Sequence, residues 1–216
     1  MKIKICGIND LEQLKELNDL EIDYTGMIFY PASQRSVINH LHGEEVKKLN
    51  LQVQKVGVFV NDPLEEVFRQ VSEFGLDMVQ LHGDETAVYC NQVSDHVKLI
   101  KAFRVGETQT EIDRMVKEFE EVCDYYLFDK GSMGIYGGTG QKFDWKVLKD
   151  AEINKPFFLS GGIEYEDLEA LEHFHHPYFY GIDINSRFEI SPGIKDMKKI
   201  TDFVQRIRAF EKIIKI

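Results

Sequence analysis

Runs of β-branched and aromatic residues recur along the whole chain, and each run is followed by a segment with the spacing of an amphipathic helix. In residues 63–74, for example, Leu64, Val67, Phe68 and Val71 fall on one helical face. Eight strands are predicted in this way, and they cover residues 3–6, 24–29, 54–60, 78–81, 98–103, 125–129, 157–159 and 180–184. The pattern is therefore eight strand–helix units in succession.

Eight such units in 216 residues predict an α/β fold with a single (β/α)₈ barrel domain, a TIM barrel, over residues 1–216. A doubly wound open sheet is the competing architecture, because the number of strands alone does not exclude it.

The sequence also marks several helix ends. Asp62 and Pro63 predict an N-cap and a first helical residue, and Thr108 and Glu111 have the spacing of a capping box. Residues 194–216 predict one long closing helix.

The charge balance of 26 basic and 37 acidic residues gives a net charge of −11, which argues against a nucleic-acid partner. The longest apolar stretches, such as residues 56–60, are too short to cross a membrane, and the N-terminus has no secretory signal pattern. Three cysteines are few and odd in number, so no disulfide framework is expected. These features favour a cytoplasmic protein.

Polar and reactive side chains stand where six of the predicted strands end. In a TIM barrel these strand ends and the loops after them form the active site. Each residue has a structural alternative; a lone cysteine, for example, is more often a small buried side chain than a reactive one. Their joint position at one rim favours a functional site. The residues are Cys6, Arg35, His82, Asp129, Gly161, Gly162, Asp183, Asn185 and Ser186.

Two other motifs do not predict a site. Residues 131–140 contain five glycines but lack both the Gly-Lys-Ser/Thr ending of a nucleotide-binding loop and the Gly-x-Gly-x-x-Gly spacing. His173, His175 and His176 have no companion cysteine or carboxylate at a ligand spacing, so we expect no metal there.

The alternation of side chains along a strand predicts a polar cluster inside the barrel. If Cys6 faces the interior, Lys4 does too, and Asp183 faces them from the eighth strand. Lys101 is assigned to the same cluster. Because a buried charge is costly unless it is paired, these residues predict an ion-pair network that supports the site.

Six segments together resemble phosphoribosylanthranilate isomerases, and they occur in the order found in that family. The segments are KICGI (4–8), GMIFYPASQR (26–35), VQLHGDE (79–85), GGTG (137–140) followed by FDW (143–145), SGGI (160–163) and SPGIKD (191–196). The resemblance covers nearly the whole chain.

The resemblance implies a cofactor-free Amadori rearrangement in tryptophan biosynthesis. N-(5-phosphoribosyl)anthranilate becomes 1-(2-carboxyphenylamino)-1-deoxyribulose 5-phosphate. Carried onto this sequence, Asp129 is the general acid that protonates the furanose ring oxygen and opens the ring to a Schiff base. Cys6 is the general base that removes the C2′ proton, and Lys4 is a candidate to favour its thiolate.

The resemblance also implies how the phosphosugar is held. Arg35 would bind the anthranilate carboxylate, and His82 and Asp183 would contact the substrate. The phosphate would rest on backbone N–H groups at Gly161, Gly162, Asn185 and Ser186.

The resemblance leaves the oligomeric state open, because related enzymes occur as monomers and as homodimers.

Two features near the site carry further expectations. Where the family commonly reads Asp-Val-Ser-Ser-Gly-Val-Glu, residues 183–189 read DINSRFE, so Arg187 replaces a glycine. Arg187 is either a solvent-facing side chain or an added contact to the phosphate. The glycine-rich residues 130–140 predict a mobile lid over bound substrate.

Two alternative functions share part of this pattern. Another phosphosugar barrel, such as an epimerase, would share Gly161 and Gly162 but has no need for Cys6, Asp129 and Arg35 together. A non-catalytic ligand-binding barrel would tolerate loss of Cys6 or Asp129, and both are present.

Overall fold

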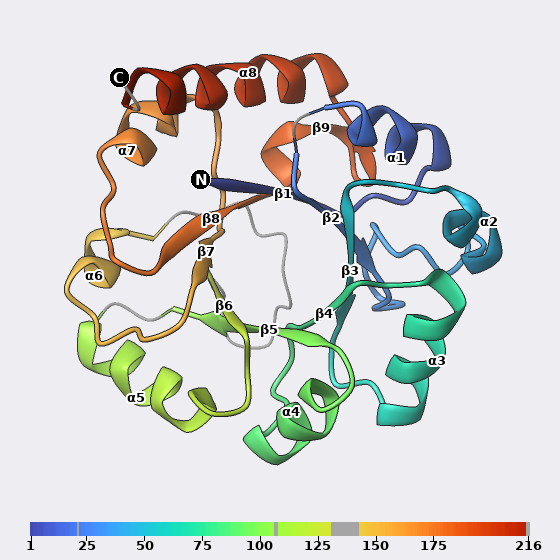
Figure 1. The fold of residues 1–216 in the computed structure, drawn as a ribbon, viewed down its shortest axis with the longest axis horizontal. Helices are drawn as coiled ribbons and strands as arrows, with labels where there is room; N and C mark the ends of the chain where they lie inside the picture. The colour runs from blue at the N-terminus through green and yellow to red at the C-terminus, as the bar shows by residue number, and fades with distance from the viewer. Residues whose placement is uncertain (21, 106–107, 131–142, 215–216) are drawn as a thin grey trace.

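The computed structural model describes residues 1–20, 22–105, 108–130 and 143–214. Its eight main strands are parallel neighbours in chain order and close into a barrel, β1-β2-β3-β4-β5-β6-β7-β8. Helices surround this barrel (Figure 1). The closed ring confirms the predicted (β/α)₈ fold and excludes the open doubly wound sheet.

The barrel strands are β1 (Lys2–Cys6), β2 (Tyr24–Ile28), β3 (Gln54–Phe59), β4 (Met78–Leu81), β5 (Lys98–Arg104), β6 (Tyr125–Asp129), β7 (Phe157–Leu159) and β8 (Phe179–Ile184). The helices are α1 (Leu11–Asn18), α2 (Gly43–Lys48), α3 (Leu64–Phe74), α4 (Ala87–Ser94), α5 (Gln109–Phe119), α6 (Lys146–Lys149), α7 (Leu168–Glu172) and α8 (Met197–Ile214), with short 3₁₀ helices at η1 (Tyr165–Asp167) and η2 (Ser186–Phe188). A separate antiparallel pair is formed by β9 (Glu189–Ser191) and β10 (Ile194–Lys195).

All eight strands lie where the sequence predicts them, with ends that differ by one residue at most. The closing helix is shorter than predicted. Ile194 and Lys195 pair with β9 instead of starting α8, which begins at Met197. Backbone pairing with a neighbouring strand therefore outweighs the helical pattern of these two residues.

One helix start is as predicted and one is wrong. The capping box of Thr108 and Glu111 is present at α5. Asp62 does not cap α3, because its carboxylate accepts the backbone N–H of Val60 at 3.2 Å. Pro63 takes the N-cap position instead, without a side-chain hydrogen bond.

The barrel interior is filled by apolar side chains below the carboxyl ends of the strands. An inner cluster is formed by Tyr24, Val56, Met78, Ile100, Ala102, Leu127 and Phe158. At the N-terminal end of the strands, the Tyr24 and Tyr180 hydroxyl groups lie 2.8 Å apart. The larger apolar cluster lies between the outer face of the barrel and the helices. In TIM barrels the carboxyl ends of the strands are where ligands bind.

The predicted ion-pair network is correct for Lys4 and wrong for Lys101. Lys4 is fully buried and its Nζ lies 2.9 Å from Asp183 Oδ1. Lys101 lies on the outer face of β5, because Ile100 and Ala102 take the interior positions. There its ammonium group binds the Glu85 carboxylate at 2.8 Å.

The expected lid at residues 130–140 lies outside the described residues except for Lys130. Within the described part of the chain, no helix is both long and apolar enough to cross a membrane.

Candidate active site

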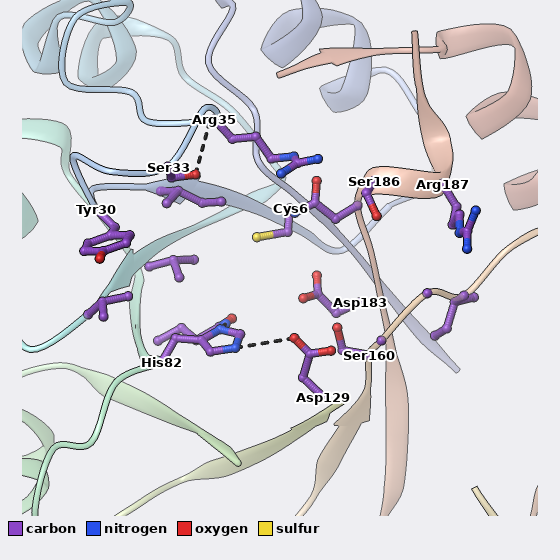
Figure 2. A pocket seen from close by; sticks show the side chains of 18 residues that line it. Cys6, Tyr30, Ser33, Arg35, His82, Asp129, Ser160, Asp183, Ser186 and Arg187 are labelled. Atoms are coloured by element: carbon purple, nitrogen blue, oxygen red, sulfur yellow. Dashed lines mark hydrogen bonds and ion pairs between the residues drawn. The ribbon is translucent and has the colours of Figure 1, made fainter. Parts of the chain in front are cut away.

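A pocket of about 780 Å³ opens at the carboxyl ends of the barrel strands, and it brings together all nine predicted site residues (Figure 2). The lining also includes residues for which the sequence predicted no role, namely Ile28, Tyr30, Ser33, Val58, Val60, Gln80, Ser160 and Ile163.

The thiol of Cys6 lies at the end of β1, beside the Lys4–Asp183 ion pair. Figure 2 shows the Asp183 carboxylate between Cys6 and Asp129. Burial raises the pKa of the Cys6 thiol, although the positive charges of Lys4 and Lys195 act in the opposite direction. Burial acts to lower the pKa of Lys4, but Asp183 and Cys6 outweigh it and the net shift is upward. Lys4 therefore stays charged and opposes part of the burial effect on the thiol.

Asp129 and His82 face each other across the pocket from β6 and from the end of β4. His82 Nε2 lies 3.5 Å from Asp129 Oδ2, as the dashed line in Figure 2 marks. The other ring nitrogen, Nδ1, lies 2.9 Å from the side-chain nitrogen of Gln80. The imidazole thus connects a carboxyl group in the pocket with an amide in the barrel interior.

Arg35 is held by two residues that the sequence analysis did not single out. Its Nε and Nη2 donate to the Glu189 carboxylate, at 3.0 Å and 2.7 Å. Lys195 Nζ donates to the same carboxylate and to Asn185 Oδ1, both at 2.7 Å. Glu189 and Lys195 come from the β9–β10 pair. Glu189 matches the last residue of the family pattern at 183–189, and Lys195 lies in the matching segment SPGIKD. This match to the family could have identified both residues.

Close packing at the end of β1 leaves room only for glycine at position 7. Gly7 has a φ of +79°, and a Cβ there would lie 2.8 Å from Asn185 Oδ1 and 2.9 Å from Arg35 Cδ. A side chain at this position would displace the two neighbouring side chains, so the sequence KICGI fixes the first loop against the pocket wall.

The loop after β7 presents two glycines in a row to the pocket. Gly161 and Gly162 have φ values of +87° and +67°, a conformation that residues with a side chain rarely adopt. With no Cβ at either position, an anion can approach the backbone closely. This geometry suits the phosphate contact that the resemblance implies.

Arg187 is accommodated without backbone strain. It lies in the 3₁₀ helix η2, and Asn61 is the one non-glycine residue with positive φ in the described part of the chain. Its half-exposed guanidinium lines the pocket, with Nε 3.9 Å from Glu164 Oε2. An arginine can therefore replace the family's glycine here.

The adjacent histidines do not converge on one point. His173 Nδ1 contacts the Glu169 carbonyl, and His176 Nε2 contacts the Ala151 carbonyl. Across residues 1–20, 22–105, 108–130 and 143–214, no three His, Cys, Asp or Glu side chains are grouped to hold a metal ion.

Known proteins are similar to this chain in both sequence and fold. Residues 3–206 match the family model of N-(5'phosphoribosyl)anthranilate (PRA) isomerase. An N-(5'-phosphoribosyl)anthranilate isomerase from Parabacteroides distasonis is 41% identical over 209 residues, which cover 96% of this chain and 93% of that protein.

Solved structures agree with this match. A phosphoribosyl anthranilate isomerase from Thermotoga maritima superimposes with a TM-score of 0.83 at 29% identity, covering 97% of this chain and 99% of the other. Another structure of such an enzyme was solved in complex with reduced 1-(o-carboxyphenylamino)-1-deoxyribulose 5-phosphate; its TM-score is 0.79 at 28% identity, covering 97% of this chain and 99% of the other. The chain belongs to the N-(5'-phosphoribosyl)anthranilate isomerase family.

Proposed function

We propose that this pocket converts N-(5-phosphoribosyl)anthranilate to 1-(2-carboxyphenylamino)-1-deoxyribulose 5-phosphate, with Asp129 as general acid and Cys6 as general base. The observation that carries the assignment is that a carboxyl group and a thiol from separate strands line the same pocket. An aldose–ketose rearrangement needs one group to give a proton and one to take a proton, and these two side chains suit those tasks.

The first step opens the sugar ring. Asp129 donates a proton to the ring oxygen, the C1′–O bond breaks, and the lone pair of the anthranilate nitrogen forms a C1′=N double bond. His82 contacts the Asp129 carboxyl group at 3.5 Å and holds it toward the pocket.

In the second step the Cys6 thiolate removes the C2′ proton. The electron pair of the broken C–H bond forms a C1′=C2′ double bond, and the C1′=N pair returns to nitrogen. The enolamine that results rearranges to the ketone. Because burial raises the pKa of the thiol, the base form of Cys6 is gained at a higher pH than in an ordinary cysteine.

The substrate's two anionic ends are assigned to different groups that line the pocket. Arg35 would bind the anthranilate carboxylate through the guanidinium edge that Glu189 does not occupy. Backbone N–H groups after β7 and β8 would bind the phosphate, where glycine φ values allow close approach. His82 and Asp183 would contact the sugar between them.

Turnover by the purified protein tests the function. Freshly made phosphoribosylanthranilate, in buffer without added metal or cofactor, is expected to lose its anthranilate-type fluorescence, and chromatography is expected to show the ketose product. Fluorescence that stays at the level of a protein-free control would reject the function. Release of free anthranilate as the sole product would reject it too.

Arg35→Lys is expected to raise KM although the charge is kept. Lysine cannot provide the planar fork that serves Glu189 on one edge and a carboxylate on the other. Steady-state kinetics check this, with exposed Arg69→Lys as control. Unchanged KM and kcat in Arg35→Lys would show that Arg35 does not bind the substrate.

Arg187→Ala is expected to raise KM several-fold and to weaken the salt dependence of kcat/KM, since its charge offsets the unfavourable net charge of −11 for an anionic ligand. Arg187→Gly restores the common family residue while removing the charge, and the same change in KM is expected. If both variants keep the original KM at low ionic strength, Arg187 does not contribute to phosphate binding.

A further inference from the structure

Gln80 is a fully buried polar residue next to the proposed acid. It lies on β4, between Val58 and Ile100 of the neighbouring strands, and is 0% exposed. Its side-chain nitrogen lies 2.9 Å from His82 Nδ1. Its side-chain oxygen has no hydrogen-bond partner among the described residues. An unpaired buried amide oxygen is costly, so its presence here requires an explanation.

The proposed mechanism leaves one requirement open. Asp129 has to carry a proton when it meets the ring oxygen, but an ordinary aspartate has lost its proton at neutral pH. His82 faces this carboxyl group, with its Nε2 3.5 Å from Asp129 Oδ2. The amide, the imidazole and the carboxyl group thus form a continuous series from the barrel interior to the pocket.

An amide group can serve both protonation states of such a pair. When the amide N–H of Gln80 points toward His82 Nδ1, Nδ1 accepts a hydrogen bond, and a single proton is shared between His82 Nε2 and the Asp129 carboxylate. When the amide carbonyl points toward Nδ1, Nδ1 carries a proton and donates to it, so the His82–Asp129 pair holds one proton more. A half-turn of the amide exchanges the two arrangements. Within the described residues the Gln80 side chain makes no other hydrogen bond that this turn would break.

We propose that Gln80 is a positioning residue for the acid step, and that its amide turns to support the His82–Asp129 pair both with and without the proton that Asp129 delivers. The inference rests on the proposed role of Asp129 as general acid. When the substrate ring opens, the proton leaves Asp129 for the ring oxygen and the amide N–H turns toward Nδ1. The pair regains a proton from water after the product leaves, and the carbonyl turns back.

Other charged groups also act on this pair and have to be kept constant in a test. Asp183 on β8 interacts electrostatically with both members of the pair. Lys4 and Cys6 face Asp183 from β1. Arg104 on β5 is the register neighbour of Asp129. A neutral substitution of Gln80 leaves all these charges in place.

Gln80→Met tests the proposal, because methionine has a similar size but neither donates nor accepts strongly. Met78→Leu is the matched control: Met78 lies on the same strand and the same face, one layer deeper in the barrel. NMR titration of His82 gives the midpoint at which the pair takes up its proton, and kcat is measured over the same pH range. The His82 signals are assigned by their loss in His82→Asn.

Gln80→Met is expected to lower the midpoint by about half to one pH unit, because a hydrogen bond to the more positive, protonated ring is worth more than one to the neutral ring. Above the midpoint kcat falls by the matching factor, below it kcat is unchanged, and KM changes by less than about twofold. Met78→Leu shifts neither curve. Gln80→Leu is expected to repeat the result if the methionine variant folds poorly.

A midpoint that stays in place, with kcat lowered by one factor at every pH, would show that Gln80 is only a packing residue. A shifted midpoint with an unchanged kcat profile would show that the pair does not supply the catalytic proton. The NMR titration needs no turnover. Absence of turnover in the unsubstituted protein would therefore overturn the proposed function separately from this inference.

Discussion

Cys6→Ala and Asp129→Asn are each expected to lower kcat by about 10²- to 10⁴-fold while leaving the barrel folded. Removal of a positioned general acid or base typically has an effect of this size. The two side chains come from β1 and β6 and line one pocket, so neither can take over the other's position. Both substitutions are small, and they change groups that face the pocket instead of the apolar layer under the helices.

Fluorescence-based kinetics and thermal unfolding check both parts of this prediction. Cys90→Ala serves as the control, because Cys90 is a buried thiol on α4, outside the pocket. Its kcat is expected to stay within about twofold of the original. Retention of more than a tenth of the original rate by either Cys6→Ala or Asp129→Asn would reject the assigned role.

The largest expected loss of stability follows from Lys101→Met. Lys101 and Glu85 are both buried, and their side chains lie 2.8 Å apart on the outer face of the barrel. The Glu85 carboxylate also accepts backbone N–H groups of Asn61 and Gly83. Removing the lysine leaves a buried carboxylate without its counter-ion, which typically costs about 3–5 kcal/mol.

Urea unfolding measures this loss, and the same strand provides a matched control. Lys98 is 63% exposed at the start of β5, and its Nζ lies 3.7 Å from Asp124. Lys98→Met is expected to change the free energy of unfolding by at most about 1 kcal/mol. Equal losses for the two lysine variants would contradict the account, because burial of the pair is the only reason to expect a difference.

The fold and the site could be predicted from the sequence where local patterns are unambiguous. Strand and helix spacing alternates eight times, and parallel strands of this kind close into one barrel. Once the strands are assigned, their carboxyl ends must meet at one rim. This rule alone places Cys6, His82 and Asp129 in one pocket.

The sequence did not predict correctly which side chains of β5 point into the barrel. A barrel strand is buried on both faces, so Leu99 and Ile100 are both apolar and the sequence does not show which faces inward. The register with β4 and β6 decides this, and it places Ile100 inside and Lys101 outside. The expected contact of Lys101 with Asp183 was wrong for this reason.

Contacts between distant parts of the chain were also beyond the sequence patterns. Arg35 and Glu189 are 154 positions apart. They meet because the β9–β10 pair folds over the end of β1, where Lys195 also reaches Asn185. The helical pattern of residues 194–216 concealed this strand pair, so the groups that hold Arg35 became apparent only in the structure.

In the proposed mechanism Cys6 removes the C2′ proton after Asp129 has opened the ring. The most direct test is the isotope effect for substrate that carries deuterium at C2′, measured in Cys6→Ser and in Asp129→Asn with protein in excess of substrate. The serine hydroxyl is hardly ionised at neutral pH, so proton removal becomes the slow step in Cys6→Ser and a primary isotope effect is predicted there. In Asp129→Asn ring opening is the slow step, and an isotope effect near unity is predicted. An isotope effect near unity in Cys6→Ser would show that Cys6 is not the base that removes the C2′ proton.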